Sequence, residues 1–317
     1  MDKKINILFT SSGRRVSLIN SFIELREDVG KIITADRNNL VPTAMISDKH
    51  YTISSVRNEN YISEIINICK EENINLVVPL IDPELTILSK SLNCFEEIGV
   101  KVLVSSEELN NIANNKVDTY NFFIENNILT PKVYNVQEIN EITYPIVIKP
   151  FDGSSSKGVT IVKNVRELSF FREYIPNAMI QEYVVGKEYT VDVMLDFSGN
   201  IITIVPRLRI ETRAGEVSKG RTVKDIEIIN AAKEVVEKLP GAMGCITLQC
   251  FKKDDGSIVF IEINPRFGGG IPLSIGAGAN FALWTIQILR GNSIKYSSSW
   301  KEDVTMLRYD KAILIGT

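Results

Sequence analysis

The chain has 317 residues, of which 44% are hydrophobic and 24% charged, and its formal net charge is −3 at pH 7. A chain of this length buries a large core and is expected to form two or three domains rather than one. This composition is that of an ordinary globular protein. Because basic residues are not in excess, the net charge argues against nucleic acid as a partner.

Targeting signals are not evident in the sequence. The first residues lack the long apolar region and the cleavage site of a signal peptide, and no stretch is apolar for long enough to span a bilayer. We therefore expect a cytoplasmic protein without a membrane partner.

Histidine and cysteine usage restricts the chemistry. His50 is the single histidine, so a multi-histidine zinc site within one chain is excluded, and no nucleophile motif accompanies this residue. The four cysteines form no CxxC pair, and we expect buried free thiols. They are Cys69, Cys94, Cys245 and Cys250.

Apolar runs alternate with helical patterns in the first third of the chain. Strands are expected at residues 5–10, 31–35, 76–80 and 101–104, and helices at 14–26, 61–72 and 84–97. This alternation indicates βαβ units and a parallel sheet, with ligands beyond the carboxyl ends of the strands. The loop after the first strand has one glycine rather than the three of GxGxxG, which disfavours a nicotinamide dinucleotide.

The strand ends of this first part carry charged candidates for substrate binding. They are Arg14, Arg15, Asp82 and Glu84. Their mixed charge would suit a zwitterion such as an amino acid, whereas the alternative is a purely solubilising role at loop ends.

The remainder of the chain predicts a different architecture. A helix at 116–125 and a strand at 145–149 precede strands at 188–196, 201–210, 244–251 and 258–263, with helices at 225–239 and 279–290. We expect an α+β part whose antiparallel sheet carries polar groups on one face.

A loop rich in glycine and serine follows the strand that ends at Lys149. Its backbone N–H groups could cradle phosphate oxygens while Lys149 supplies a charge, and the alternative is a flexible hairpin. It is not a Walker A loop, because Val159-Thr160 follow Gly158 in place of Lys-Ser/Thr. The loop residues are Gly153, Ser154, Ser155, Ser156 and Gly158.

The next segment could bind a nucleoside. Backbone groups in the first part of residues 179–193 could hydrogen-bond an adenine edge, and Glu188, six residues after Glu182, could accept from ribose hydroxyls. Each acid alone is more often a solvated strand residue.

The sequence Ile258-Val-Phe-Ile-Glu-Ile-Asn-Pro-Arg266 runs into a glycine triplet. In a strand, Glu262, Asn264 and Arg266 would face one way, and Ile261 and Ile263 the other. Carboxylate and amide oxygens suit Mg²⁺, and an arginine suits phosphate. The hairpin through residues 252–257 would bring Gln249 beside Glu262. The alternative is a solvated strand with an ordinary turn.

Together these motifs resemble the ATP-grasp superfamily, in particular its carbamoyl-phosphate-synthetase-like branch. Lys116, Lys149, the glycine-serine loop, residues 181–184, Glu188, Gln249 and Glu262-x-Asn264-x-Arg266 occur in the family's order. The resemblance implies an α/β, parallel-sheet pre-ATP-grasp domain at 1–105. It further implies an α+β, two-subdomain ATP-grasp module, with the phosphate loop in residues 106–180 and the metal site in 181–317.

The resemblance also implies roles for the site residues. Lys116 and Lys149 would contact ATP phosphates under the 153–158 loop, residues 182–184 would hold adenine, and Glu188 would hold ribose. Gln249, Glu262 and Asn264 would bind Mg²⁺, with Mn²⁺ as an alternative, and Arg266 would stabilise the transferred phosphoryl group. Many relatives have an acid where Gln249 stands, so the amide places the chain nearer the carbamoyl-phosphate-synthetase branch.

The implied activity is an ADP-forming carboxylate–amine ligase that acts through an acyl phosphate on small molecules. Alternatives are a small-molecule kinase of the carbamate type and a non-catalytic ATP-binding regulator. The basic segment 206–221, with Arg207, Arg209, Arg213, Lys219 and Arg221, could clamp the substrate carboxylate or form a solvated loop. We assign a catalytic role to Arg207 beside Arg266 and Lys149. The apolar helices of the first part would permit a homodimer.

Overall fold

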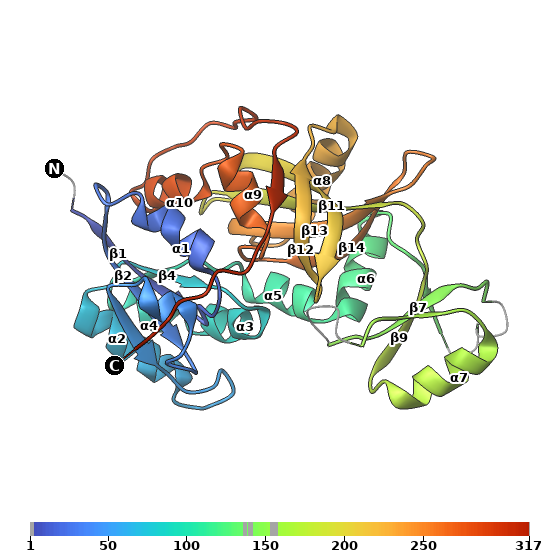
Figure 1. The fold of residues 1–317 in the computed structure, drawn as a ribbon, viewed down its shortest axis with the longest axis horizontal. Coiled ribbons are helices and arrows are strands. Elements are labelled where there is room, and N and C mark those ends of the chain that lie inside the picture. Colours follow the sequence, from blue (N-terminus) through green and yellow to red (C-terminus); the bar gives the residue numbers. More distant parts are fainter. Residues whose placement is uncertain (1–2, 136–137, 139–141, 153–157, 317) are drawn as a thin grey trace.

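The computed structural model describes residues 3–135, 138, 142–152 and 158–316. Its described strands form three sheets, which lie from left to right in Figure 1 as a parallel sheet, a large antiparallel sheet and a small antiparallel sheet. No helix in these ranges is long and apolar enough to cross a membrane.

The first sheet is parallel, as predicted. Its order is β3-β2-β1-β4-β5, and the central strand β1 pairs with both β2 and β4. Strand β1 is buried almost throughout, because helices cover both faces of such a sheet. The strands are β1 (Ile5–Thr10), β2 (Val29–Asp36), β3 (Lys49–Thr52), β4 (Leu76–Pro79) and β5 (Lys101–Val102). The helices are α1 (Val16–Ile23), η1 (Pro42–Met45), α2 (Tyr61–Glu72), α3 (Asp82–Lys90) and α4 (Leu92–Glu96).

Two predictions for this part are corrected. The single helix expected at 84–97 is interrupted at Ser91, whose backbone leaves the helical region and whose hydroxyl donates to the carbonyl of Ile87. Cys94 is exposed rather than buried, because in the short α4 it is Phe95 that enters the core. The other three cysteines are buried and all four are free thiols.

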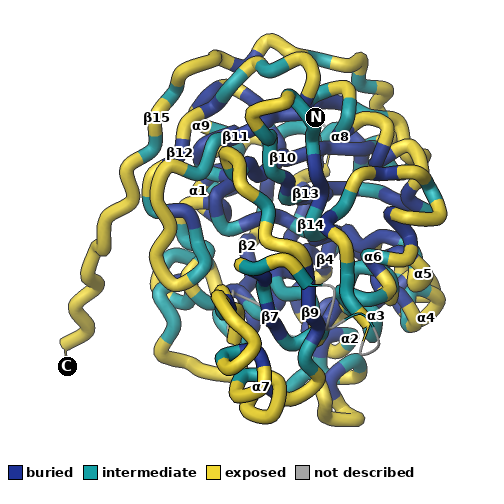
Figure 2. The backbone as a smooth tube through the Cα atoms, turned by 90° about the vertical axis from the view of Figure 1, so that its right-hand side faces the viewer, coloured by how far each residue is buried: buried dark blue, intermediate teal, exposed yellow. Residues whose placement is uncertain are grey.

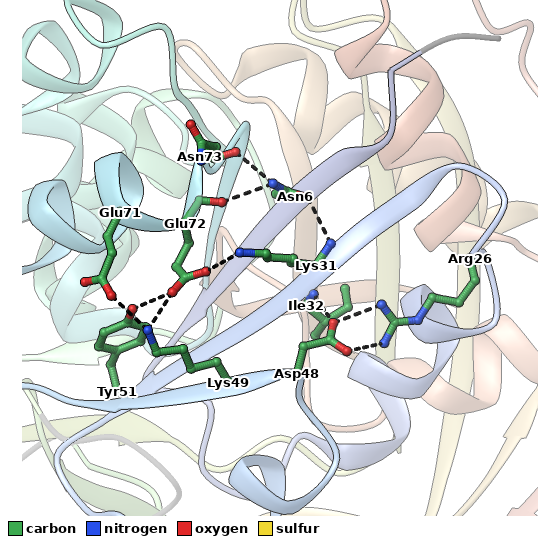
Figure 3. A network of polar contacts seen from close by, with 10 residues as sticks. All are labelled: Asn6, Arg26, Lys31, Ile32, Asp48, Lys49, Tyr51, Glu71, Glu72 and Asn73. Atoms are coloured by element: carbon green, nitrogen blue, oxygen red, sulfur yellow. Dashed lines mark hydrogen bonds and ion pairs between the residues drawn. The ribbon is translucent and has the colours of Figure 1, made fainter.

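A polar network ties the edge strand β3 to the neighbouring elements (Figure 3). The buried carboxylate of Glu72 accepts from the ammonium groups of Lys31 and Lys49 and from the hydroxyl of Tyr51. These hydrogen bonds, led by that of Lys31, lower the pKa of Glu72 to about 2. The end of α2 is therefore anchored to β2 and β3 through one ionised side chain.

The small sheet is antiparallel, with the order β6-β9-β7-β8 and helix α7 packed against it. Its core consists mainly of Ile146, Ile148 and Val162 with Leu168 of the helix. The elements are β6 (Val133–Tyr134), β7 (Ile146–Pro150), β8 (Thr160–Val162), α7 (Val165–Tyr174) and β9 (Ala178–Glu182). Helix α7 and the short β6 were not predicted.

The large sheet is also antiparallel, with the order β14-β13-β10-β11-β12-β15. Its strands are β10 (Lys187–Leu195), β11 (Ile201–Arg213), β12 (Glu216–Thr222), β13 (Gly244–Lys252), β14 (Ile258–Asn264) and β15 (Thr305–Leu307). The helices of this part are α5 (Glu107–Asn114), α6 (Lys116–Glu125), α8 (Ile226–Lys238), α9 (Ile271–Gly276) and α10 (Phe281–Leu289). Beyond β15 the chain runs outward as an exposed segment (Figure 2).

The large sheet has two cores. One lies between the sheet and helices α5, α6 and α8, and the other joins it to the first sheet through α1, α9 and α10. In the second core Phe22 contacts both Phe9 and Phe267. Phe267 in turn contacts Phe281. The carboxyl ends of β1 and β4 are thereby fixed against the large sheet. The domain boundaries expected after residues 105 and 180 remain predictions.

Candidate active site

The hairpin of β13 and β14 carries the predicted polar cluster. Gln249 lies directly opposite Glu262, and Thr247 lies opposite Asn264. The pairing of Gln249 with Glu262 that the sequence predicted is therefore confirmed. Because alternate residues of a strand share a face, Glu262 and Asn264 project to the same side.

The alternation along β14 is broken at one residue. Ile263 is buried in the core as predicted, but Ile261 lines cavities beside Glu262. The pairing register shifts between Gln249 and Cys250, so that an extra residue of β14 stands unpaired. Such a bulge re-aims its side chain, which explains the error in the prediction for Ile261.

Two cavities meet at the pair of Gln249 and Glu262, which lines both. The first, of about 270 Å³, lies between the small and large sheets and has apolar walls that include Val147, Ile161 and Phe251. The second, of about 290 Å³, lies between the large sheet and the end of β4, and its walls are polar. A flat apolar group therefore fits on one side of the pair and a charged group on the other.

Lys149 lies in the apolar cavity with 8% of its surface exposed, and its Nζ donates to Gln181 Oε1 at 2.7 Å. Burial, assisted by the charge of Lys116, lowers the pKa of Lys149 to about 8 despite the nearby carboxylate of Glu262. Lys116, the first residue of α6, also lines this cavity. Two cations thus face the polar end of an otherwise apolar cavity.

The proposed nucleoside-binding residues line the same cavity. These are Glu182, Tyr183, Val184 and Glu188. The backbone N–H of Glu182 donates to the carbonyl of Lys132, and its carboxylate accepts from the Lys132 N–H. Glu188 forms an ion pair with Arg209 at 3.0 Å, and burial raises its pKa. Because the N–H of Glu182 is already used, the backbone groups of Tyr183 and Val184 are the candidates to recognise a base.

The glycine-serine loop is described only at its end. Gly153, Ser154, Ser155 and Ser156 lie outside the described residues. Gly158 has a φ of +73°, and a Cβ there would lie 3.0 Å from ring atoms of Pro150. Both the backbone angle and the close approach therefore require glycine.

Four arginines line the polar cavity, and besides Arg209, which pairs with Glu188, two more are held by carboxylates. Arg266 donates to Asp82 Oδ2 at 2.7 Å and to Asn264 Oδ1 at 3.0 Å. Arg207 is 1% exposed and donates through Nε and Nη2 to Asp192, at 2.6 and 2.9 Å. Its Nη1 is buried and has no hydrogen-bond acceptor among the described residues. Two N–H donors of a rigid guanidinium thus remain without an acceptor among the described residues, on a side chain that lines the polar cavity.

The glycine triplet that follows Arg266 makes room for these guanidinium groups. A Cβ on Gly270 would lie 2.3 Å from Nη1 of Arg207, and one on Gly269 would lie 2.8 Å from Nη1 of Arg15. Because neither approach leaves space for a side chain, the triplet forms part of the arginine-binding wall.

Several candidates from the sequence lie elsewhere. Glu84 is fully buried and accepts from Tyr61 and from the backbone N–H of Leu80, which makes it a structural residue of α3 rather than a cavity residue. The basic segment forms the β11–β12 hairpin and not a loop. Arg207 and Arg209 line the cavity from one face, as predicted. The other cations of the segment pair with acids at the surface: Arg213 with Asp310, Lys219 with Glu211, and Arg221 with Asp303.

The sequence did not reveal every residue that shapes the site. Asp192 is fully buried and also accepts from the hydroxyl of Ser274 at 2.6 Å, and Glu216 lines the polar cavity. For Asp192 the sequence did contain a signal, namely an acid within the otherwise apolar run of β10. A buried carboxylate without a partner is costly, so such an acid implies a cation or hydrogen-bond donor beside it.

The oxygen atoms on the β13–β14 hairpin fit a hard cation that takes its remaining ligands from elsewhere. Gln249, Glu262 and Asn264 supply one carboxylate and two amide oxygens, which Mg²⁺ accepts. No group of three or more His, Cys, Asp or Glu side chains that could hold a metal occurs in the described ranges. With a single carboxylate, the site suits a cation that arrives with phosphate oxygens.

Comparison with known proteins places the chain in a family. A model of the ATP-grasp domain matches residues 113–270, and a model of the PylC-like N-terminal domain matches residues 7–103. A D-alanine–D-alanine ligase from Fusobacterium nucleatum is 27% identical over 44% of this chain, and the match spans about half (52%) of that ligase. A tyramine–L-glutamate ligase from Methanocaldococcus jannaschii is 27% identical over 79% of this chain and 73% of its own length.

A solved structure supports the same assignment at the level of the fold. The biotin carboxylase domain of the Hydrogenobacter thermophilus 2-oxoglutarate carboxylase, in complex with MgADP, ADP and bicarbonate, has a TM-score of 0.76. It is 18% identical and covers 96% of this chain and 74% of that one. Carbamoyl phosphate synthase large chains are also among the relatives in sequence. The chain belongs to the ATP-grasp superfamily, with a PylC-like N-terminal domain before the ATP-grasp domain.

Proposed function

We propose that the protein is an ATP- and Mg²⁺-dependent carboxylate–amine ligase that acts on small molecules through an acyl phosphate and releases ADP and phosphate. The observation that carries this proposal is that Gln249 and Glu262 line both the apolar and the polar cavity. A nucleotide in the first would present its terminal phosphate to an acid in the second. The ligases among the relatives in sequence support the same class of reaction.

The apolar cavity holds the nucleotide in this proposal. Lys116 and Lys149 contact its phosphates, the segment from Glu182 to Val184 binds adenine, and Glu188 binds ribose. The last contact competes with the ion pair between Glu188 and Arg209, so that Arg209 turns with its partner or shares it. Burial of Lys149 makes its charge effective, because a charge in a dry site is poorly screened.

The polar cavity holds the acid. Gln249, Glu262 and Asn264 hold Mg²⁺, which would neutralise phosphate charge. Arg266 faces the transferred phosphoryl group and remains oriented by Asp82. Arg207 offers its unused Nη1 to the carboxylate, and Asp192 prevents the guanidinium from turning away. Alignment and charge neutralisation of this kind are what phosphoryl transfer requires.

The proposal is tested by measuring ADP and phosphate release from Mg-ATP with a panel of carboxylates, each with and without amines. We expect release that requires both an acid and an amine. Glu262→Gln should abolish it, whereas Glu234→Gln on the exposed face of α8 should not. ADP with a stable phosphorylated product would establish a kinase, AMP with pyrophosphate would exclude the acyl phosphate, and ATP binding without turnover would indicate a regulator.

A further inference from the structure

A third cavity, of about 200 Å³, lies where the loop after β1 meets α9 and the segment after β15. Its wall contains three arginines, Arg14, Arg15 and Arg308, and one acid, Glu216. The proposed reaction does not use Arg14 or Arg308. We call it the arginine cavity.

The arginine cavity adjoins the polar cavity. Arg15, Glu216, Gly268 and Gly269 line both of them. A molecule whose reacting carboxylate lies near Arg266 would therefore extend past Arg15 into the arginine cavity. The missing side chain of Gly269 is part of this passage, because a Cβ there would lie 2.8 Å from Arg15 and 3.2 Å from Glu216.

The charges around this passage do not balance. Asp82 is paired with Arg266 at 2.7 Å, and Glu216 is paired with Arg308 at 2.8 Å. Among the described residues, neither Arg14 nor Arg15 has a carboxylate within ion-pair distance. Burial and the charge of Arg266 lower the pKa of Arg15 to about 10, although the charges of Glu216 and Asp82 act in the opposite direction.

The loop that carries these arginines is fixed by the surrounding structure. Ser11 has a φ of +48°, which is uncommon for a residue with a side chain, and its hydroxyl donates to the buried Glu84 at 3.1 Å. The N–H of Gly13 donates to Asp36 at 2.9 Å, and the hydroxyl of Ser12 contacts that of Thr43 at 2.8 Å. Arg14 and Arg15 therefore project from a backbone that is already ordered before a ligand binds.

We propose that the acid substrate carries a second anionic group, a carboxylate or a phosphate, and that Arg14, Arg15 and Arg308 bind this group in the arginine cavity. The inference rests on the proposed ligase function for the role of the first carboxylate. It replaces the zwitterion suggested by the sequence, because Glu84 is buried away from the cavities and Asp82 is neutralised by Arg266. The substrate class is a small acid with two anionic ends.

Calorimetric titration without ATP tests the subsite. The probes are butyrate as a monoanion, glutarate as a dicarboxylate, and 3-phosphoglycerate as a phosphorylated acid. The variant is Arg14→Gln, since Arg14 is exposed and lines only the arginine cavity. Arg57→Gln, on an exposed residue outside the cavities, is the matched control.

We expect the unaltered protein to bind at least one of the two acids with a second anionic group about tenfold more tightly than butyrate, and Arg14→Gln to remove this preference. Arg57→Gln should retain it. Preference for glutarate or for 3-phosphoglycerate identifies the second group. Equal affinity for all three acids, or a preference that survives Arg14→Gln, would overturn the proposal.

The same probes with Mg-ATP and an amine separate this proposal from the proposed function. Binding of glutarate or 3-phosphoglycerate that depends on Arg14, without ADP release with any acid and amine, would overturn the ligase and leave the anion subsite standing. ADP release that is as efficient with butyrate as with glutarate and 3-phosphoglycerate would support the ligase and overturn the subsite.

Discussion

At the scale of single residues, the site is built from buried charges with different partners. Arg207 is held by an ionised carboxylate, Asp192, whereas Lys149 is held by the neutral amide of Gln181. An amide satisfies the hydrogen-bond donor without neutralising the charge, so burial lowers the pKa of Lys149 to about 8. The two cations should therefore respond differently to pH and to mutation.

ATP binding should weaken as Lys149 loses its proton. Its pKa is lowered to about 8, so the charged form predominates below that pH and is lost as the pH rises through it. We expect the Kd for ATP to rise by about tenfold per pH unit above that value. Lys149→Arg keeps its charge and should bind ATP with a flat profile up to about pH 10. Equal profiles for the two proteins in fluorescence titrations would show that Lys149 does not carry the dependence.

Asp192 should matter for stability and for the acid substrate together. Asp192→Asn leaves the guanidinium of Arg207 buried without its counter-ion, which should cost about 3–5 kcal/mol in urea unfolding. It should also raise the KM for the acid, because Arg207 loses its orientation. Asp310→Asn breaks the exposed pair with Arg213 and serves as the control, with both quantities unchanged. If the two variants behaved alike, the buried pair would have no special role.

At the scale of secondary-structure elements, the β13–β14 hairpin and the glycine triplet bring the cavities together. Alternation correctly predicted that Glu262 faces Gln249, because hairpin pairing follows from a short turn. The bulge that turns Ile261 into the cavity could not be predicted, since it depends on the partner strand. From the sequence, an ordinary turn was the interpretation offered for the triplet, but its glycines make space for Arg15 and Arg207.

A methyl group on the triplet should therefore impair the acid site. Gly270→Ala places a Cβ 2.3 Å from Arg207 and 2.7 Å from Val217, and we expect a lower kcat and a higher KM for the acid with little change in ATP affinity. Gly276→Ala is the matched control, because a Cβ there meets nothing within 4 Å. Steady-state kinetics would refute this role if both substitutions were tolerated equally.

At the scale of the whole molecule, the site depends on contacts between segments that are distant in sequence. Strand-helix alternation predicted the parallel sheet, and long β-like runs predicted the main strands of the large sheet, because both are strong sequence patterns. The short edge strands β3 and β15 escaped prediction, as half-exposed strands lack such a pattern. The contact between Arg266 and Asp82 crosses 184 residues, and only the shared core of the two sheets brings these residues together.

The first sheet should lose stability in acid through Glu72. Its pKa of about 2 lies below the ordinary value, so its stabilisation is complete above about pH 4.5 and is lost as the pH falls towards 2. Glu72→Gln should cost about 1–3 kcal/mol at neutral pH, because Lys31, Lys49 and Tyr51 lose an acceptor. The deficit relative to the unaltered protein should shrink in unfolding experiments towards pH 3. A deficit that is independent of pH would assign the loss to packing instead.

The acyl phosphate is tested most directly by following carboxylate oxygen. An acid labelled with heavy oxygen (¹⁸O) that supports turnover is incubated with Mg-ATP, the amine and the protein, and the released phosphate is analysed by mass spectrometry. The labelled oxygen attacks the γ-phosphorus, and the amine then displaces phosphate from the carbonyl carbon, so we expect one labelled atom in each phosphate. Unlabelled phosphate with all label retained in the organic product would contradict activation of the carboxylate by phosphoryl transfer.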